Sequence, residues 1–463
     1  MEVDLTNKKR IHFIGIGGIS MSGLAEIAIK NGYEVTGSDI KDSHLIDKLR
    51  DKGAVVGVPH KAELVEGASL VVFTAAVKMD NPEMQRANEL GIPMMERSDY
   101  LGSLMKKYSY GIAISGTHGK TTTTSMTGIV FREAGFDPTI LVGGEVSALG
   151  GNVITGVSEY FITEACEYVD SFLKFYPFVG VILNIEADHL DYFRDIDHIK
   201  ESFAKFSALI PEDGFLIVSA DSENSMEIGK KSGKNLITFG IGPESDYRAE
   251  NIISDGEGHG NYTLTFKGET LCQVSLSVPG KHNIINSLAV MATAITAGID
   301  PKKAAETIAT FKGTSRRFEQ KGREKGITVI DDYAHHPTEI QASLEAASNL
   351  KHNRIWVVFQ PHTYTRTRTL FNDFSHSFTK ADSVIVTDIY AAREKDPGDV
   401  SVKALSDAIS ENGVMCQYCG DFDVISDIIS ESAKDGDIVF TMGAGDITNL
   451  GPLILEKIKL KSK

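Results

Sequence analysis

The chain has 463 residues, 42% hydrophobic and 24% charged, a balance typical of a soluble globular protein with several domains. Its formal net charge of −16 argues against a nucleic-acid partner or an anionic membrane surface. No apolar run approaches the ~18 residues of a membrane span, residues 1–10 do not resemble a signal peptide, and the four cysteines are unevenly spaced, so we expect a cytoplasmic protein.

Residues 1–107 begin like a nucleotide-binding unit. A short apolar strand leads into Gly15-Ile16-Gly17-Gly18-Ile19-Ser20, and the pattern then predicts a helix over about 20–30 and a second strand over 33–37. The fingerprint G-x-G-x-x-G is only partly met, because a serine stands at the third glycine. The loop indicates a site for the diphosphate of a nucleotide, with packing glycines as the alternative. Asp39 lies where an acidic residue meets a ribose hydroxyl.

The strongest signal is the run Gly116-Thr117-His118-Gly119-Lys120-Thr121-Thr122. A strand is predicted before it, over 110–115, and a helix after it, over 122–134. This is the layout of a phosphate-binding loop, in which backbone N–H groups and a helix N-terminus hold phosphate oxygens. Lys120 is expected to reach the β- and γ-phosphates and Thr121 to ligate Mg²⁺. The usual spacing is not met, because Ile114 stands where the first glycine belongs.

Two more groups with metal-binding chemistry follow predicted strands in this part of the chain. Glu164 comes after the strand at 160–163, and His189 comes after the strand at 179–183. The carboxyl ends of parallel strands share the edge of a sheet where ligands bind. Thr121, Glu164 and His189 are therefore predicted to meet at one Mg²⁺–nucleotide site. The alternative is that such groups only cap turns and helices.

Residues 245–279 have a different pattern, which predicts antiparallel hairpins separated by glycines. A helix is expected from there to about residue 297. Asn283 and Asn286 lie three apart on one face of it, and asparagine amides can both donate to and accept from a base. For Asn283, helix capping is the alternative interpretation.

Residues 314–463 form a third predicted unit, another α/β sheet. Its strands are expected at 327–330, 355–359, 383–387 and 436–441. Acidic, histidine and arginine side chains again cluster after strand ends and at the start of the unit, including Arg316, Asp332, His335 and Arg366. The residues alone thus predict two nucleotide sites, of which only the one with Lys120 is equipped for phosphoryl chemistry.

Seven motifs resemble those of the Mur ligase family and together span essentially the whole chain. They are His12–Gly23, Gly116–Thr122, Asn184–His189, Gly280–Asn286, Arg316–Glu319, Asp332–Thr338 and Phe359–His362. The glycine loop before Met21-Ser22-Gly23 is most similar to that of the members that add L-alanine. The resemblance implies an α/β fold of three domains: a Rossmann-like UDP-substrate-binding domain (1–107), a central P-loop ATP-binding domain with an antiparallel β portion (108–313), and a C-terminal Rossmann-like ligase domain (314–463).

The resemblance also implies a reaction in peptidoglycan precursor synthesis. ATP phosphorylates the carboxylate of UDP-N-acetylmuramate, and the amine of L-alanine attacks the resulting acyl phosphate. Mg²⁺ is implied as cofactor, with Mn²⁺ as a substitute. The implied catalytic residues are Lys120, His189, His335 and Arg366, and the implied metal ligands are Thr121, Glu164 and His189. ATP would be bound by Gly116, Thr117, His118, Gly119, Lys120, Thr121, Thr122, Asn283, Asn286, Arg316 and Asp332, and the UDP part by Gly15, Gly17, Gly18, Ile19, Ser20 and Asp39.

Three alternative functions remain open at this point. A sibling ligase attaches a murein tripeptide to the same sugar nucleotide, and the third unit offers no residue that discriminates between the two acceptors. A nucleotide-binding sensor without ligation and a nicotinamide dehydrogenase built on the first unit are the others. Two positions depart from the family pattern: Thr363 stands where relatives often carry arginine, and Cys166 replaces a carboxylate. The oligomeric state is also open.

Overall fold

The computed structural model describes residues 9–190, 192–392 and 394–461. Helices alternate with strands that form three mainly parallel sheets, which confirms the predicted α/β class. The chain divides into two compact units. The first comprises the chain up to Ile185 with 200–238 and 292–299, and the second comprises 186–199, 239–291 and 300–463.

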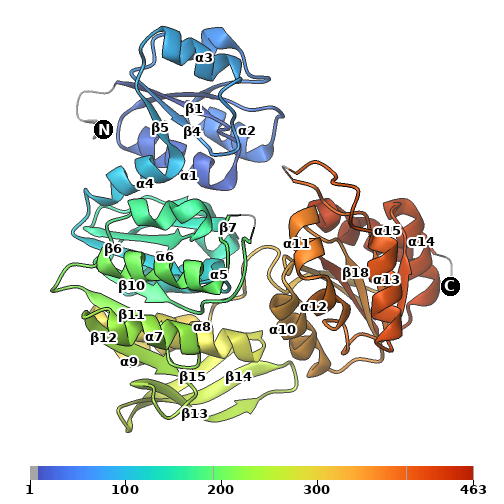
Figure 1. Cartoon of the computed structure of the whole chain (residues 1–463). Helices are drawn as coiled ribbons and strands as arrows, with labels where there is room; N and C mark the ends of the chain where they lie inside the picture. Colours follow the sequence, from blue (N-terminus) through green and yellow to red (C-terminus); the bar gives the residue numbers. More distant parts are fainter. Residues whose placement is uncertain (1–8, 191, 393, 462–463) are drawn as a thin grey trace. The chain divides into compact units, whose positions relative to one another are not determined.

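The first sheet lies in the first unit and is parallel throughout, with strand order β3-β2-β1-β4-β5. Its strands are β1 (Arg10–Ile14), β2 (Glu34–Ser38), β3 (Val55–Gly57), β4 (Leu70–Phe73) and β5 (Met94–Glu96), and its helices are α1 (Ile19–Lys30), α2 (His44–Asp51), α3 (Pro82–Glu89) and α4 (Arg97–Met105). Figure 1 shows α3 on one face of this sheet and α1 with α2 on the other. With both faces covered, β1 is buried at four of its five residues, three of them apolar.

The first unit also holds the strands that carry the phosphate loop, in the order β11-β10-β6-β9-β7-β8. They are β6 (Tyr110–Ser115), β7 (Thr139–Val146), β8 (Gly151–Ile154), β9 (Tyr160–Ala165), β10 (Val179–Ile182) and β11 (Phe215–Ser219). β6 pairs in parallel with β10 on one side and with β9 on the other. The segments that follow β6, β9 and β10 therefore start at one edge of the sheet. Helix α5 (Lys120–Glu133) follows β6, and α7 (Glu223–Lys231) follows β11.

The second unit contains the predicted hairpins and a separate parallel sheet. Strands β13 (Tyr247–Ser254), β14 (His259–Phe266) and β15 (Glu269–Pro279) pair antiparallel, which confirms the hairpin prediction. The other sheet has the order β16-β17-β21-β18-β19-β20, with only the β16–β17 pair antiparallel. Its strands are β16 (Glu319–Glu324), β17 (Ile327–Asp332), β18 (Ile355–Phe359), β19 (Ser383–Val386), β20 (Met415–Tyr418) and β21 (Ile438–Met442).

Each face of that sheet has its own hydrophobic core. One core joins α10 (Pro337–Ser348), α12 (Phe371–Ser375) and α13 (Val402–Glu411) to the sheet. The other core joins α14 (Phe422–Ser432) and α15 (Leu450–Leu460) to the opposite face. Side chains of the strands alternate between the two cores, so that Val357 and Phe359 lie in the first and Trp356 and Val358 in the second.

The remaining elements complete the chain. They are α6 (Ile196–Ala208), β12 (Asn235–Gly240), α8 (Lys281–Thr296), α9 (Pro301–Ile308) and α11 (Tyr364–Thr369), with short 3₁₀ turns at Ala62–Val65, Ser147–Leu149, Tyr168–Lys174 and Asp446–Asn449. The predicted helices and strands agree with the structure to within a residue or two. The boundaries of the three domains stay a prediction. Within the described ranges, no helix combines the length and the apolar character needed to span a bilayer.

Candidate active site

The phosphate loop joins the end of β6 to the start of α5. Gly116 and Gly119 have φ angles of 136° and 84°, which side-chain-bearing residues rarely adopt. A Cβ on Gly116 would also lie 3.0 Å from Cβ of Leu183. Asn184 fixes the loop from the neighbouring strand end: its Oδ1 accepts from the N–H of His118 at 2.8 Å, and its carbonyl accepts from the N–H of Thr117 at 3.1 Å. The loop is thus held in shape before any ligand binds.

Lys120 is partly buried among acceptors at the first position of α5. Its Nζ donates to the carbonyl of Gly116, to the carbonyl of Thr117 at 3.1 Å, and to Oε2 of Glu167 at 3.0 Å. Burial alone would lower the pKa of Lys120, but the carboxylate of Glu167 outweighs it and raises the pKa above its usual value. Lys120 therefore carries a positive charge at neutral pH, in the place where the terminal phosphates of a nucleotide are expected.

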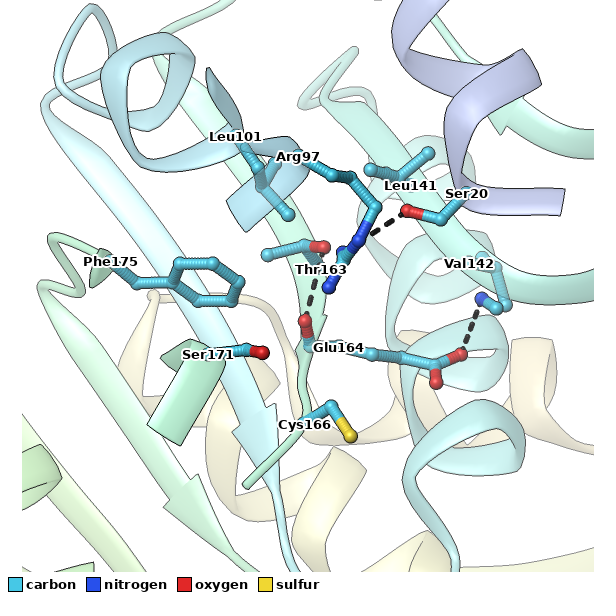
Figure 2. A pocket seen from close by; sticks show the side chains of 11 residues that line it. Ser20, Arg97, Leu101, Leu141, Val142, Thr163, Glu164, Cys166, Ser171 and Phe175 are labelled. Atoms are coloured by element: carbon cyan, nitrogen blue, oxygen red, sulfur yellow. Dashed lines mark hydrogen bonds between the residues drawn. The ribbon is translucent and has the colours of Figure 1, made fainter. Parts of the chain in front are cut away.

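The structure brings together Thr121 and Glu164, two of the three predicted metal ligands. Oγ1 of Thr121 donates to Oε2 of Glu164 at 3.1 Å, and Oε1 of Glu164 accepts from the N–H of Gly143 at 2.6 Å. A hydroxyl and a carboxylate oxygen are the ligands that Mg²⁺ prefers. Figure 2 shows Glu164 on the wall of a cavity that Arg97 and Cys166 also line. Burial raises the pKa of the Cys166 thiol, so this wall carries a neutral group beside Glu164.

The glycine loop of the first sheet is held by a carboxylate instead of a lysine. Gly15 has a φ of 81°, and the N–H groups of Gly15 and Ile16 donate to the carbonyl of Ser38 at the end of β2. Oδ2 of Asp39 accepts from the N–H of Gly17 at 2.8 Å. Ser20, in the first turn of α1, accepts a hydrogen bond from Nη1 of Arg97 at 3.3 Å. Asp39 and the loop are thus brought together, while the binding of a ribose by Asp39 stays a prediction.

Asn283 and Asn286 lie together on α8 in the second unit. Nδ2 of Asn286 donates to Oδ1 of Asn283 at 3.2 Å, and Nδ2 of Asn283 donates to the carbonyl of Pro279 at 2.7 Å. Both side chains are buried. These hydrogen bonds hold the two side-chain amides in fixed positions. Their role in binding adenine stays a prediction.

Arg316 and Asp332 flank the ends of the second unit's parallel sheet. Nη2 of Arg316 donates to the carbonyls of Gly443 and Gly445 at 2.7 and 3.0 Å. Asp332 accepts from Oγ of Ser343 at 2.7 Å. Burial raises the pKa of Asp332 to about 6, against the lowering effect of the Ser343 hydrogen bond. Asp332 is therefore mostly charged at neutral pH and poised to accept hydrogen bonds.

His189 and Arg366 both border Asp188 in the second unit. The guanidinium of Arg366 donates through Nε and Nη2 to Oδ1 of Asp188, at 3.1 and 3.0 Å, and Nε2 of His189 lies 3.8 Å from Oδ2. Burial would raise the pKa of Asp188, but the charges of His189 and Arg366 outweigh it and hold the pKa well below its usual range. Whether His189 joins Thr121 and Glu164 around a metal stays a prediction.

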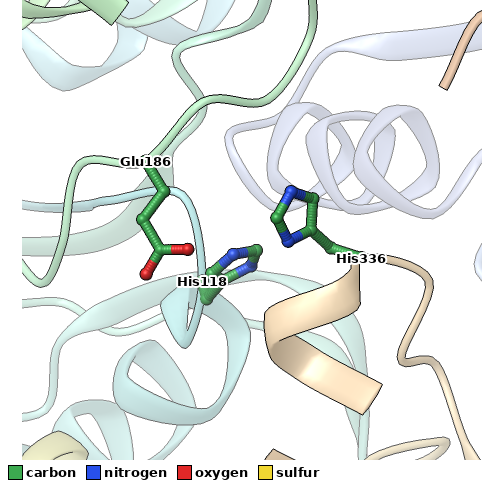
Figure 3. Close-up of side chains that lie close together, drawn as sticks. All are labelled: His118, Glu186 and His336. Atoms are coloured by element: carbon green, nitrogen blue, oxygen red, sulfur yellow. The ribbon is translucent and has the colours of Figure 1, made fainter. Parts of the chain in front are cut away.

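His335 is kept neutral near the Asp188–Arg366 ion pair. Burial lowers its pKa to about 3, despite the carboxylate of Glu339 at 3.2 Å from Nδ1. Glu186 and His336, drawn in Figure 3, belong to the same unit. His336 is the N-cap of α10, and Oε2 of Glu186 accepts from Oγ1 of Thr338 at 2.9 Å. The structure therefore gathers the neutral imidazole of His335 and paired charges near the start of α10.

The sequence predicted no individual role for four residues of the site: Asn184, Glu167, Asp188 and Glu339. Each holds a predicted residue in place through a contact between segments far apart in the chain or, for Glu339, one helical turn away. An acidic residue after a strand end is a weak signal for such a contact. The pairing of Asp188 with Arg366, 178 residues later, has no signal in a single sequence.

Three family descriptions match successive parts of the chain. They are "Mur ligase family, catalytic domain" over residues 10–109, "Mur ligase middle domain" over 114–294, and "Mur ligase, glutamate ligase domain" over 316–445. A UDP-N-acetylmuramate–L-alanine ligase from Caldanaerobacter subterraneus is 54% identical over 99% of this chain and 100% of its own length. The chain belongs to the Mur ligase family. A relative of the same name from Clostridium acetobutylicum is 51% identical, with the same coverage.

Solved structures agree with this Mur ligase assignment. The UDP-N-acetylmuramate–alanine ligase from Thermotoga maritima has a TM-score of 0.83 at 31% identity, covering 97% of this chain and 99% of its own. A murein peptide ligase from Psychrobacter arcticus has a TM-score of 0.74 at 26% identity, covering 98% and 100%. The three-domain Mur ligase architecture is therefore the fold of this chain.

Proposed function

We propose that this Mur ligase joins L-alanine to the carboxylate of UDP-N-acetylmuramate, with ATP as co-substrate, in the synthesis of peptidoglycan precursors. The observation that carries the proposal is the 51–54% identity, over the full length, to relatives named UDP-N-acetylmuramate–L-alanine ligase. The loop around Lys120 supports it, because a partly buried cation at a helix N-terminus fits the triphosphate of ATP.

The reaction brings two anions together. A carboxylate oxygen of the sugar nucleotide attacks the γ-phosphorus of ATP, ADP leaves, and an acyl phosphate forms. The amine of L-alanine then attacks the acyl carbon, loses a proton, and expels inorganic phosphate. Lys120 offsets the negative charge that builds on the transferred phosphoryl group, at a site where burial strengthens the interaction. Glu167 keeps the ammonium of Lys120 charged and in place.

The oxygens of Thr121 and Glu164, 3.1 Å apart, fit a hard cation such as Mg²⁺, and Mn²⁺ has the same preference. We assign His189 as the third protein ligand. When bound, Mg²⁺ would supply charge neutralisation on the phosphate oxygens. Thr121 and Glu164 would hold it next to the phosphate loop.

The other predicted residues take binding roles in this proposal. The glycine loop with Asp39 holds the UDP part, and Asn283 with Asn286 reads adenine. Arg316 and Asp332 bind the phosphates and the ribose of ATP. His335 and Arg366 border the acceptor amine. A neutral His335 suits this position, because it does not repel the positive end of the incoming amino acid.

Phosphate release from ATP tests the function directly. The protein is mixed with ATP, Mg²⁺ and UDP-N-acetylmuramate, and L-alanine, glycine, L-serine or the murein tripeptide is added separately. We expect rapid release only with L-alanine, together with a product heavier by one alanine residue in mass spectrometry. No phosphate release with any of the acceptors would exclude the ligase function.

The runner-up function is ligation of the murein tripeptide. The 26% identity to the Psychrobacter arcticus murein peptide ligase, over nearly the whole of both chains, makes this the nearest competing activity. Release with the tripeptide but not with L-alanine would assign that activity instead. The identity of 54% to an L-alanine ligase favours L-alanine.

A further inference from the structure

The cavity in Figure 2 connects two sites that were predicted separately. It has a volume of about 150 Å³ and lies within the first unit. Ser20 of the glycine loop lines one part of it, and Glu164 of the predicted metal site lines another. Its volume is below the ~300–1,000 Å³ of sites that hold a whole small molecule. It therefore fits a fragment of a substrate whose other parts lie outside it.

Arg97 is the cation of this cavity. It is the first residue of α4, and Figure 2 shows its guanidinium between Ser20 and Glu164. The hydrogen bond to Ser20 uses one of the five N–H donors of a guanidinium. The adjacent carboxylate of Glu96 lies 4.0 Å from Nε and is engaged by Ser98, whose N–H donates to it at 2.7 Å. Arg97 thus has donors to offer to a ligand.

The remaining wall is mainly apolar. Leu101, Leu141 and Phe175 line it, alongside the small polar groups Thr163 and Ser171. A diphosphate would gain little from this wall, because it has no apolar part. A short branched acid, with a carboxylate at one end and a methyl group beside it, would use both the guanidinium and the apolar side chains.

The charge balance points the same way. The carboxylate of Glu164 faces the cavity and would repel a second carboxylate placed there. An arginine on the same cavity offsets that repulsion, and its planar donor fork matches a carboxylate. A substrate carboxylate held by Arg97 would lie beside Glu164 and Thr121, which are hydrogen-bonded to each other next to Lys120.

We propose that Arg97 binds the lactyl carboxylate of the sugar-nucleotide substrate in this cavity and orients it toward the phosphate loop. This inference rests on the proposed function, since that function supplies the lactyl group. It makes Arg97 a substrate-binding residue that acts on the acyl end, distinct from the groups that hold UDP.

The test compares three ligands that differ at one end. UDP, UDP-N-acetylglucosamine and UDP-N-acetylmuramate share the nucleotide, and only the last carries the lactyl ether. Their affinities are measured by titration calorimetry for the wild type, Arg97→Met and Arg97→Lys. Arg86→Met is the matched control, because Arg86 lies on α3, does not line the cavity, and is bonded to Glu66 and Glu89. Thermal unfolding checks that each variant is folded.

We expect Arg97→Met to weaken UDP-N-acetylmuramate binding about 10- to 100-fold, as for loss of a charged hydrogen bond, and to leave the other two ligands unchanged. Arg97→Lys keeps the charge without the fork and should lose about tenfold or less. In phosphate release, KM for UDP-N-acetylmuramate should rise while KM for ATP stays constant.

Two results would overturn the proposal. Equal weakening of all three ligands would place Arg97 at the diphosphate, and unchanged binding of all three would remove it from the site. If Arg97→Met does not fold, Arg97→Lys decides by the same comparison. If the wild type turns over normally and either of these two results is found, the role of Arg97 is excluded and the ligase function is retained. If the wild type releases no phosphate, the ligase function and the role of Arg97 are both excluded.

Discussion

The glycine loop at 15–20 and the phosphate loop at 116–121 have the same backbone plan and different side chains. Each joins a parallel strand to a helix, β1 to α1 and β6 to α5, and each turns on a glycine with positive φ, 81° at Gly15 and 84° at Gly119. Only the phosphate loop adds a cation, the partly buried Lys120. Both loops thus have the strand, tight turn and helix N-terminus that can hold a phosphate, and only the phosphate loop adds a positive side chain of the kind that phosphoryl transfer needs.

The charged pairs near the two loops differ in their exposure to solvent. Lys120 is held by Glu167 at the surface of the loop, where a ligand can reach it. Under the glycine loop, His12 and Glu83 are fully buried and bonded to each other at 3.1 Å. In the proposed function the Lys120–Glu167 pair acts on the ligand, whereas the buried His12–Glu83 pair stabilises the fold. Four substitutions test this difference.

The largest effect is expected from Lys120→Ala. Removing the cation should cost roughly 3 kcal/mol or more of transition-state stabilisation, which lowers the phosphate-release rate at least 100-fold. Affinity for UDP-N-acetylmuramate should stay unchanged, because the glycine loop lacks this lysine. Lys303→Ala on α9 is the control for removal of an exposed lysine. Unchanged turnover in Lys120→Ala would remove the phosphate-loop assignment.

Glu164→Gln should raise the Mg²⁺ requirement. The amide keeps the shape of the side chain but removes the charge that attracts the cation, so the Mg²⁺ concentration for half-maximal phosphate release should rise about 10- to 100-fold. The same result is expected with Mn²⁺. Glu133→Gln, at the far end of α5, serves as control. Coincident Mg²⁺ titration curves for Glu164→Gln and the wild type would exclude Glu164 as a ligand.

Asp39→Asn should weaken the binding of UDP at the glycine loop without slowing the reaction. The carboxylate accepts from the N–H of Gly17, and the proposal gives it a ribose hydroxyl as well. We expect affinity for UDP to fall about tenfold, on the scale of a charged hydrogen bond, with the maximal rate preserved at saturating substrate. Calorimetry with UDP and a rate measurement at saturation separate the two. A lower maximal rate with unchanged UDP affinity would contradict this division of roles.

The two loops could be found from the sequence because their signals are local. Glycine spacing, a following helix and the Lys120-Thr121 pair all lie within a few residues. The antiparallel hairpins and the central strands of the third sheet were predicted for the same reason. Strands β3, β16 and β20 were missed, since they are short or polar segments at sheet edges that lack a buried apolar pattern.

Contacts between distant segments could not be predicted. Glu83 illustrates this: it lies in the first turn of α3, after the N-cap Asn81 and Pro82, and its side chain bonds His12, 71 residues away. Arg97 likewise gains its significance only from the cavity it lines with Glu164. A single sequence carries no information on which partner such a buried group meets.

Glu83→Gln should produce the smallest effect, on stability instead of activity. Oε2 of Glu83 accepts from Ser38 at 2.5 Å and lies 3.1 Å from His12, and Oε1 accepts from the N–H of Lys61 at 2.9 Å. A glutamine cannot accept all of these bonds, so we expect a loss of about 1–2 kcal/mol in the free energy of unfolding at pH 7. Phosphate-release kinetics should stay unchanged. Glu89→Gln, exposed on the same helix, is the control.

The pH dependence of that loss identifies its cause. Burial would raise the pKa of Glu83, but its hydrogen bonds with His12 and Ser38 outweigh burial and lower the pKa below 4.5. A carboxyl with a lowered pKa in the folded state stabilises the protein above its unfolded-state pKa, and this contribution disappears as pH falls through the folded-state value. The stability gap between wild type and Glu83→Gln, measured by urea unfolding, should therefore be largest near pH 7 and narrow below about pH 4.5. A gap independent of pH would mean that the amide disturbs packing, and that the charge of Glu83 does not stabilise the glycine loop.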